Sequence, residues 1–155
     1  VATGPDVIDV RVADNGKGMD EATLARALEP FYSEAGKHSR RRVGLGLPLL
    51  VQTAQAVNGT VDIRSAPGQG TTVRFTLDAR HLDTPPLGDL PGTVTALLAL
   101  GDGFDLRLTR TTPHDRYQVS RQELVEALGD LAEADSLVLA KRFLESQEKS
   151  MVEAR

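Results

Sequence analysis

Apolar and polar residues alternate in three stretches of the first half of the chain, at positions 8–12, 61–63 and 73–77. A period of two residues places every second side chain on the same face, which is typical of a half-buried strand. The Pro-Gly-Gln-Gly sequence at residues 67–70 separates the last two stretches and predicts that they form a β-hairpin. We therefore expect three strands, two of which are neighbours in the sheet.

Helical spacing replaces this alternation in the segments between the strands. Asp20 suits the N-cap position of a short helix, and Pro30 ends that helix. Apolar residues recur at helical spacing from 47 to 57, and Asn58-Gly59 marks the end of this second helix. Strands and helices in this order predict an α+β two-layer sandwich, in which an open sheet carries helices on one face.

A change of composition divides the chain. We interpret residues 81–92 as a linker between a domain of residues 1–80 and a small C-terminal α/β appendage of residues 93–155. The appendage is predicted to contain helices at 93–100, 120–129 and 135–152 and strands at 104–111 and 116–120. Ser120 followed by Glu123 is a capping box, which predicts where the middle helix begins.

Composition narrows the function without defining it. The chain has 155 residues, a net charge of -4 and no cysteine. The negative charge argues against general attraction to nucleic acid or membranes, and the absence of cysteine excludes disulfides and thiolate metal sites. No apolar run of about 18 residues and no signal peptide are visible, so we expect a cytoplasmic protein without a membrane segment. Val1 directly precedes a strand, and we expect further residues upstream of it.

Four short patches carry the candidate chemistry. They are Asp14–Met19, Glu29–Ser33, Gly44–Leu47 and Gly68–Thr72, in this order. Glycines in such patches let the backbone pass close to a ligand or adopt positive φ. Each patch taken alone is equally consistent with an ordinary turn, a loop before a helix or a hairpin. Their order and spacing together predict a nucleotide pocket.

In this order the patches resemble the second half of a histidine-kinase-like (GHKL) ATPase domain. Sensor histidine kinases, type II topoisomerases, mismatch-repair ATPases and a heat-shock chaperone share this fold, and the resemblance covers residues 7–77. It implies that the ligand is ATP or ADP. Asp14 matches the family's adenine-reading aspartate, whose carboxylate accepts a hydrogen bond from the adenine amino group. Thr71 matches a threonine that helps to bind adenine through its hydroxyl group and a water molecule.

The resemblance also assigns the rest of the pocket. Met19 lies beside the base, and the helix that follows Gly44 faces the phosphates with its free N–H groups. Residues 33–43 form a lid whose basic side chains neutralise phosphate charge, although a solvated basic loop is an alternative interpretation. The expected nucleotide-binding residues are Asp14, Gly16, Gly18, Met19, Phe31, Lys37, Arg42, Gly44, Leu45, Gly46, Leu47 and Thr71.

The sequence departs from the family in one respect that concerns catalysis. The family's Mg²⁺-binding asparagine lies on a helix before the first strand, and no residue before Val7 matches it. We therefore predict no metal site within this chain, assign no catalytic residue, and expect residues 1–155 alone to be inactive. Phosphoryl transfer or ATP hydrolysis, as in the kinases of signal transduction, is expected only if an upstream segment supplies the asparagine that binds Mg²⁺. The alternative is a non-catalytic regulatory module that senses nucleotide or binds a partner protein through its appendage.

A narrower resemblance concerns the appendage. The Pro86–Asp89 and Ala127–Asp130 segments resemble parts of small stand-alone ATP-binding proteins that are encoded beside iron-only hydrogenase genes in anaerobes. This resemblance does not imply a function.

Overall fold

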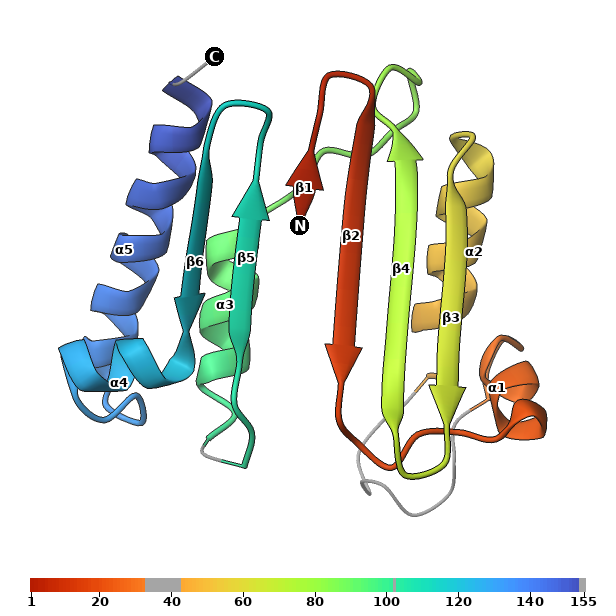
Figure 1. The fold of residues 1–155 in the computed structure, drawn as a ribbon, viewed down its shortest axis with the longest axis horizontal. Coiled ribbons are helices and arrows are strands. Elements are labelled where there is room, and N and C mark those ends of the chain that lie inside the picture. The colour runs from red at the N-terminus through yellow and green to blue at the C-terminus, as the bar shows by residue number, and fades with distance from the viewer. Residues whose placement is uncertain (33–42, 102, 154–155) are drawn as a thin grey trace. The chain divides into compact units, whose positions relative to one another are not determined.

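The computed structural model describes residues 1–32, 43–101 and 103–153, which form two compact units (Figure 1). The N-terminal unit is Pro5–Thr84, and the C-terminal unit combines Pro85–Arg155 with Val1–Gly4. The boundary at Thr84 lies within the segment 81–92 that we interpreted as a linker. The predicted division places residues 1–4 in the N-terminal domain, but in the structure they belong to the C-terminal unit, because they pair with one of its strands.

The described residues of the N-terminal unit form three antiparallel strands in the order β3-β4-β2. The strands are β2 (Val7–Asp14), β3 (Thr60–Ala66) and β4 (Gly70–Asp78), and β3 and β4 form the predicted hairpin. All three predicted strands are confirmed, and each is longer than its alternating stretch. The alternation covers only the apolar part of each strand, whereas backbone pairing continues to the polar strand ends.

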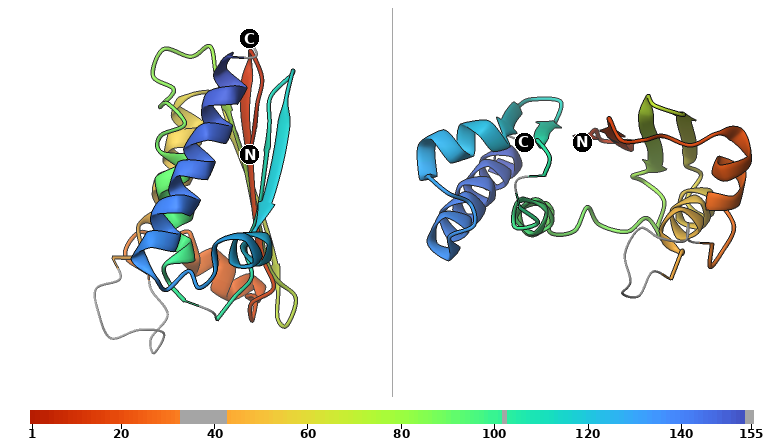
Figure 2. Two further views of the ribbon diagram at one scale, coloured as in Figure 1. Left: turned by 90° about the vertical axis from the view of Figure 1, so that its left-hand side faces the viewer. Right: turned by 90° about the horizontal axis from the view of Figure 1, so that it is seen from below.

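Helices α1 (Glu21–Ala27) and α2 (Gly46–Ala56) accompany this sheet. Figure 2 shows α2 lying against one face of the sheet, where Ala54 and Val57 are buried with Leu77 in a small core. The predicted N-cap of α1 is confirmed, because the Asp20 carboxylate accepts a hydrogen bond from the Thr23 N–H at 2.7 Å. The α2-facing side of the sheet is called the inner face below.

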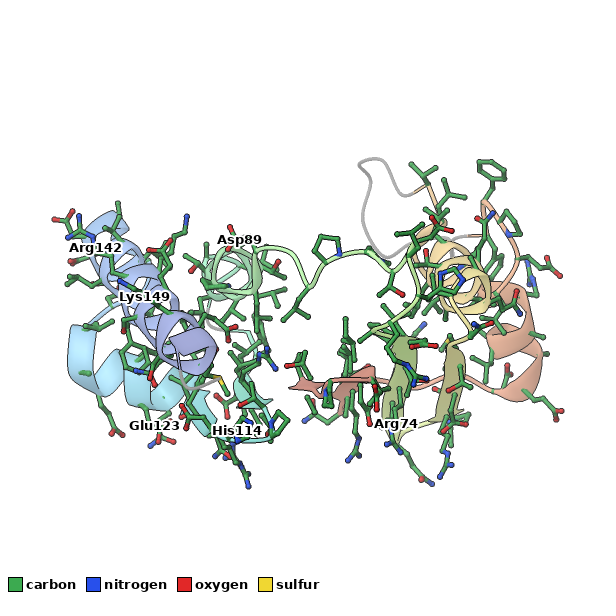
Figure 3. The ribbon with its side chains drawn as sticks, turned by 90° about the horizontal axis from the view of Figure 1, so that it is seen from above. Arg74, Asp89, His114, Glu123, Arg142 and Lys149 are labelled. Atoms are coloured by element: carbon green, nitrogen blue, oxygen red, sulfur yellow. The ribbon has the colours of Figure 1, made fainter. Side chains whose placement is uncertain are left out.

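The opposite face of the same sheet is polar. Arg74 of β4, labelled in Figure 3, donates to both carboxylate oxygens of Asp9 on β2, at 3.1 and 2.6 Å. This hydrogen bonding lowers the pKa of Asp9 below its ordinary value. Arg74 alternates along β4 with Val73 and Phe75, which belong to the inner face, so the strand separates a charged surface from the core.

The C-terminal unit is built on β5 (Arg107–Thr111) and β6 (Arg116–Ser120), an antiparallel pair. The two-residue strand β1 (Ala2–Thr3) runs parallel to β5, with Ala2 opposite Thr111. Helices α3 (Leu90–Leu98), α4 (Arg121–Leu128) and α5 (Ala134–Glu153) complete the unit (Figures 1 and 2). Its core is formed by Val94, Leu98, Leu108, Val119, Leu124, Leu131, Ala140 and Leu144.

The helix boundaries of this unit follow side-chain caps. The capping box of α4 is confirmed, because Ser120 accepts from the Glu123 N–H while the Glu123 carboxylate accepts from the Ser120 N–H at 2.7 Å. Helix α3 begins at Leu90, earlier than predicted, because the Asp89 carboxylate accepts from the Gly92 N–H at 2.8 Å. Asp89 and Glu123 are labelled in Figure 3. No helix among the described residues has both the length and the apolar character that crossing a bilayer requires.

A buried ionic group ties strands of the C-terminal unit to its last helix. Arg110 on β5 is only 6% exposed and lies 3.4 Å from the Glu148 carboxylate of α5. The same guanidinium donates to the Thr3 hydroxyl on β1 at 2.9 Å. Tyr117 on β6 donates its hydroxyl hydrogen to the other Glu148 oxygen at 2.7 Å. The predicted division after residue 80 did not include this attachment of β1 to the second unit.

Candidate functional site

Three polar side chains form a row across the N-terminal sheet at one end of its inner face. Thr71 on β4 is opposite Asp14 on β2 and opposite Ser65 on β3. Directly opposed residues of antiparallel strands project to the same face, so the three side chains share the inner face. The next row on this face is apolar and is formed by Val12, Ile63 and Val73. The hydrophobic face therefore ends in a carboxylate and two hydroxyl groups.

Asp14 is held by the loop that follows it. Its Oδ1 accepts a hydrogen bond from the Gly16 N–H at 2.8 Å, and the side chain is exposed. The carboxylate therefore has a defined orientation before any ligand arrives. This arrangement suits a polar group that must read one edge of a ligand, because little conformational entropy remains to be lost on binding.

The loop 14–19 packs against the β3–β4 turn. The Gly68 N–H donates to the Lys17 carbonyl at 2.7 Å, which joins the turn to the loop. Gly18 has φ +66°, and a Cβ there would lie 1.8 Å from the Ala66 carbonyl oxygen. Gly70 has φ +78°, and a Cβ there would lie 1.9 Å from the Asp14 carbonyl oxygen. Only glycine fits at both positions, and their close approach places Asp14 beside the strand that carries Thr71.

A serine that the sequence analysis did not identify joins these segments. Ser65 Oγ accepts from the Met19 N–H at 2.8 Å and lies 2.9 Å from Thr71 Oγ1 and 3.1 Å from the Gly70 carbonyl oxygen. A signal for it was available, because Ser65 falls two residues after Ile63 on the same strand face. In a hairpin turning at residues 67–70, that position is opposite Thr71.

Val12 is a second residue that the sequence analysis did not assign to the site. Its alternation with charged residues predicted a core position, yet the side chain is 59% exposed. It lies on the inner face one row from Asp14 and Thr71, opposite Val73. The polar row is therefore bordered by accessible apolar surface. Such a surface beside a fixed acceptor and a hydroxyl group suits a flat heteroaromatic group that carries a hydrogen-bond donor.

The third predicted patch forms the start of α2. Leu45 is the N-cap residue and offers no side-chain hydrogen bond, so the first turn is capped by no side chain of the described residues. Gly46 and Leu47 are the first helical residues, and Pro48 follows them without an N–H group. The N–H groups of a helix's first turn have no intrahelical acceptor and carry the positive end of the helix dipole. This end can bind an anion.

The second patch lies next to the third. Phe31 donates its N–H to the Gly44 carbonyl at 3.1 Å, which brings the residues before and after 33–42 together. Phe31 has φ +66°, which is uncommon for a residue with a side chain, and it is 74% exposed. The Arg26 guanidinium lies 4.4 Å from the centre of the Tyr32 ring. The predicted lid residues Lys37 and Arg42 lie outside the described residues.

The described charged groups around the site do not form a cluster of metal ligands. Among residues 1–32, 43–101 and 103–153, no three His, Cys, Asp or Glu side chains gather closely enough to hold an ion. The pKa of Asp20, which follows the loop 14–19, is lowered by its hydrogen bonds from Thr23. That carboxylate is engaged in capping α1. Of the predicted site residues, the structure thus brings together those of the first and last patches, and separately Phe31 with Gly44.

Comparison with known proteins identifies the family. The model of histidine kinase-, DNA gyrase B-, and HSP90-like ATPases matches residues 1–81. A Non-motile and phage-resistance protein of Caulobacter vibrioides is 40% identical over 80 residues, which are 50% of this chain and 10% of that protein. The sensor histidine kinase YxdK of Bacillus subtilis is 39% identical over 67 residues, 43% of this chain and 21% of that kinase.

A third relative extends the similarity further along the chain. The sensor protein TorS of Escherichia coli is 36% identical over 104 residues, which are 67% of this chain and 11% of that protein. The chain thus spans only a small part of the length of the curated relatives it matches. The predicted α+β fold and the resemblance to the GHKL ATPase domain are both confirmed. The chain belongs to the family of histidine kinase-, DNA gyrase B- and HSP90-like ATPases.

Proposed function

We propose that the N-terminal unit binds an adenine nucleotide, ADP or ATP. The observation that carries this proposal is the pairing of Asp14 with Thr71 at the end of the inner face, beside the exposed Val12. The adenine ring packs against Val12 and Met19, and its amino group donates to the Asp14 carboxylate. The sheet thereby supplies both the apolar and the polar parts of base recognition.

Asp14 provides the selection of adenine over guanine. Guanine carries a carbonyl oxygen where adenine carries its amino group, so two acceptors would face each other. Leaving such groups unpaired costs about 1–3 kcal/mol. The hydrogen bond from Gly16 keeps the carboxylate from turning away, so the unfavourable pairing persists.

The phosphates lie at the start of α2 in this proposal. The N–H groups of Gly46 and Leu47 and the positive end of the helix dipole face them, and Gly44 and Leu45 allow the approach. Lys37 and Arg42 of the lid neutralise further phosphate charge, while Phe31 borders the pocket. Gly16 and Gly18 let the backbone of the loop 14–19 pass close to the nucleotide.

The family and its relatives suggest a role in signal transduction for a longer protein. Two of the relatives described above bear the names sensor histidine kinase and sensor protein. In a protein of that kind, a bound Mg²⁺ would neutralise charge on the β- and γ-phosphates during phosphoryl transfer. We assign no ligand of that ion within residues 1–155. Here the chain's own residues bind the base, orient it and position the phosphates.

Calorimetric titration with ADP and GDP tests the proposal. We expect ADP to bind about fivefold to 150-fold more tightly than GDP, because the acceptor clash costs about 1–3 kcal/mol. Asp14→Ala should remove this preference. Asp62→Ala is the matched control, because Asp62 is exposed on the opposite face and pairs with Arg64. Equal affinity for ADP and GDP in the unaltered protein would refute adenine recognition by Asp14.

A further inference from the structure

The hydroxyl group of Ser65 makes three hydrogen-bonding contacts but has only one hydrogen atom to donate. Three polar atoms surround Ser65 Oγ: the Met19 N–H nitrogen at 2.8 Å, the Gly70 carbonyl oxygen at 3.1 Å and Thr71 Oγ1 at 2.9 Å. The Met19 nitrogen only donates, and the Gly70 oxygen only accepts. A serine hydroxyl has a single hydrogen to donate and two lone pairs.

Only one assignment of hydrogens satisfies all three contacts. Ser65 must donate to the Gly70 carbonyl oxygen, since that oxygen has no hydrogen to give. Thr71 must then donate its hydroxyl hydrogen to Ser65, whose two lone pairs are filled by Thr71 and the Met19 N–H. Thr71 Oγ1 keeps its lone pairs and has no hydrogen left to offer. The contact to Ser65 therefore fixes the direction in which Thr71 can bond to anything else.

We infer that Ser65 is a positioning residue that makes Thr71 a hydrogen-bond acceptor toward the ligand. With Asp14 opposite Thr71 in the sheet, the site then presents two acceptors side by side on one face. The group that matches two neighbouring acceptors is an amino group, which carries two hydrogens. A carbonyl oxygen at the same position meets two acceptors instead of one. Ser65 thus sharpens the preference for adenine, an inference that rests on the proposed nucleotide binding.

A purely structural role for Ser65 predicts something different. The hydrogen bond from Met19 also holds the loop 14–19 in place. If Ser65 had only this role, losing the bond would make Asp14 more mobile and would lower the affinities for all nucleotides by the same factor. Acting through Thr71, Ser65 changes the ratio between two bases. The distinguishing quantity is therefore the ratio of affinities for ADP and inosine diphosphate, which carries a carbonyl oxygen and a neighbouring N1–H group where ADP carries an amino group and an unprotonated N1. The contribution of Ser65 is read from how this ratio changes between variants, because the N1 difference is the same in all of them.

The test compares this ratio by calorimetry in five proteins: the unaltered chain, Ser65→Ala, Ser65→Thr, Thr71→Val and the Ser65→Ala/Thr71→Val double variant. In Ser65→Ala the Thr71 hydrogen is free to donate to the inosine carbonyl, so the preference for ADP should fall about fivefold to tenfold, the size of one hydrogen bond. In the Thr71→Val background, Ser65→Ala should leave the ratio unchanged. Ser65→Thr keeps the hydroxyl group and should restore the ratio, which also shows that position 65 tolerates substitution.

Three outcomes would overturn the inference. The first is a proportional loss of both affinities in Ser65→Ala, with the ratio unchanged. The second is a change of ratio that is as large in the Thr71→Val background as in the unaltered chain. The third is no binding of ADP by the unaltered protein, which would also refute the proposed function. If ADP binds with preference over GDP but Ser65→Ala keeps the ratio, only the inference about Ser65 fails.

Discussion

Arg110 is a charged residue in a place where charge is costly. Its side chain is 7% exposed, and its guanidinium bonds to Thr3, the Thr111 carbonyl and Glu148, whose side chain is 20% exposed. Removing a charge from water costs several kcal/mol, and only well-placed partners offset this. The stability of the C-terminal unit therefore depends on the hydrogen-bond and ionic partners of a single buried residue, Arg110.

Arg110→Ala should lower the free energy of unfolding by about 3–5 kcal/mol, because it leaves the partly buried Glu148 carboxylate without its cation. Urea unfolding measures the change. Arg74→Ala is the control, since the Arg74–Asp9 pair lies on an exposed surface and should matter far less. If the two variants lost the same free energy of unfolding, the burial of Arg110 would not explain its contribution to stability.

Tyr117 makes the same cluster sensitive to alkaline pH. Burial, and then the hydrogen bond to Glu148, raise the pKa of Tyr117 well above its ordinary value. The folded state therefore keeps this proton when the unfolded state loses it, near pH of about 10. Stability is fully present below that pH and should fall as the pH rises beyond it.

Urea unfolding at a series of alkaline pH values tests this prediction. Tyr117→Phe removes the ionisable group, so the fall in stability above pH of about 10 should become shallower. The chain has only two tyrosines and no tryptophan, so the ultraviolet absorbance of tyrosinate reports the ionisation with little overlap. If the stability of Tyr117→Phe fell with pH as steeply as that of the unaltered protein, other groups would be the cause of the loss of stability at alkaline pH.

At the scale of the elements, the helices begin in two different ways. Asp20, Asp89 and Ser120 cap α1, α3 and α4 with their side chains, whereas Leu45, the N-cap residue of α2, makes no such bond. A side-chain cap satisfies one of the N–H groups at the start of a helix. An uncapped start leaves these groups for water or for a ligand. This difference agrees with the proposed phosphate site at α2.

Ser120→Ala should destabilise the C-terminal unit by about 1 kcal/mol, because it removes the oxygen that accepts from the Glu123 N–H. Thermal unfolding followed by circular dichroism measures the effect. Ser150→Ala is a suitable control, since Ser150 is exposed near the end of α5. A loss no larger than that of the control would mean that the capping box adds nothing to stability.

At the scale of the whole molecule, the chain joins an ATPase-family unit to a unit with its own core. Residues 1–81 match the family, and the core of the C-terminal unit is formed by its own helices and strands. Strands β5 and β6 of that unit come from residues 107–120, and β1 is supplied by Ala2–Thr3. The start of the family match therefore includes a strand that packs in the second unit.

We expect residues 1–155 alone to bind nucleotide without turning it over. We assign the base and phosphate contacts within the chain, but no residue in it to hold Mg²⁺ or to accept a proton from water. A phosphate-release assay with excess ATP and Mg²⁺ should give no turnover above that of a Gly44→Ala/Gly46→Ala variant. Turnover well above this control would show that the chain contains a catalytic group, and would contradict the alternative of a non-catalytic nucleotide sensor.

The sequence by itself determined the order of the longer helices and strands in this protein, but not the two-residue strand β1. Alternation and helical spacing report burial along a short stretch, and caps such as Asp20 and Ser120 act within one turn, so these features are readable locally. The patches also indicated the ATPase family. Their proposed contacts at Asp14 and Thr71 come from resemblance, because two residues far apart in the sequence have no local relation.

Only the tertiary structure decided which distant residues meet. The register of β2 on β4 places Asp14 opposite Thr71, and the hairpin places Ser65 there as well. The burial of Arg110 and the pairing of Ala2 with Thr111 likewise depend on segments that are far apart in the sequence. Hydrophobic periodicity shows which face of an element is apolar but not which residues cover it, because the partners are selected by backbone pairing and packing across the fold.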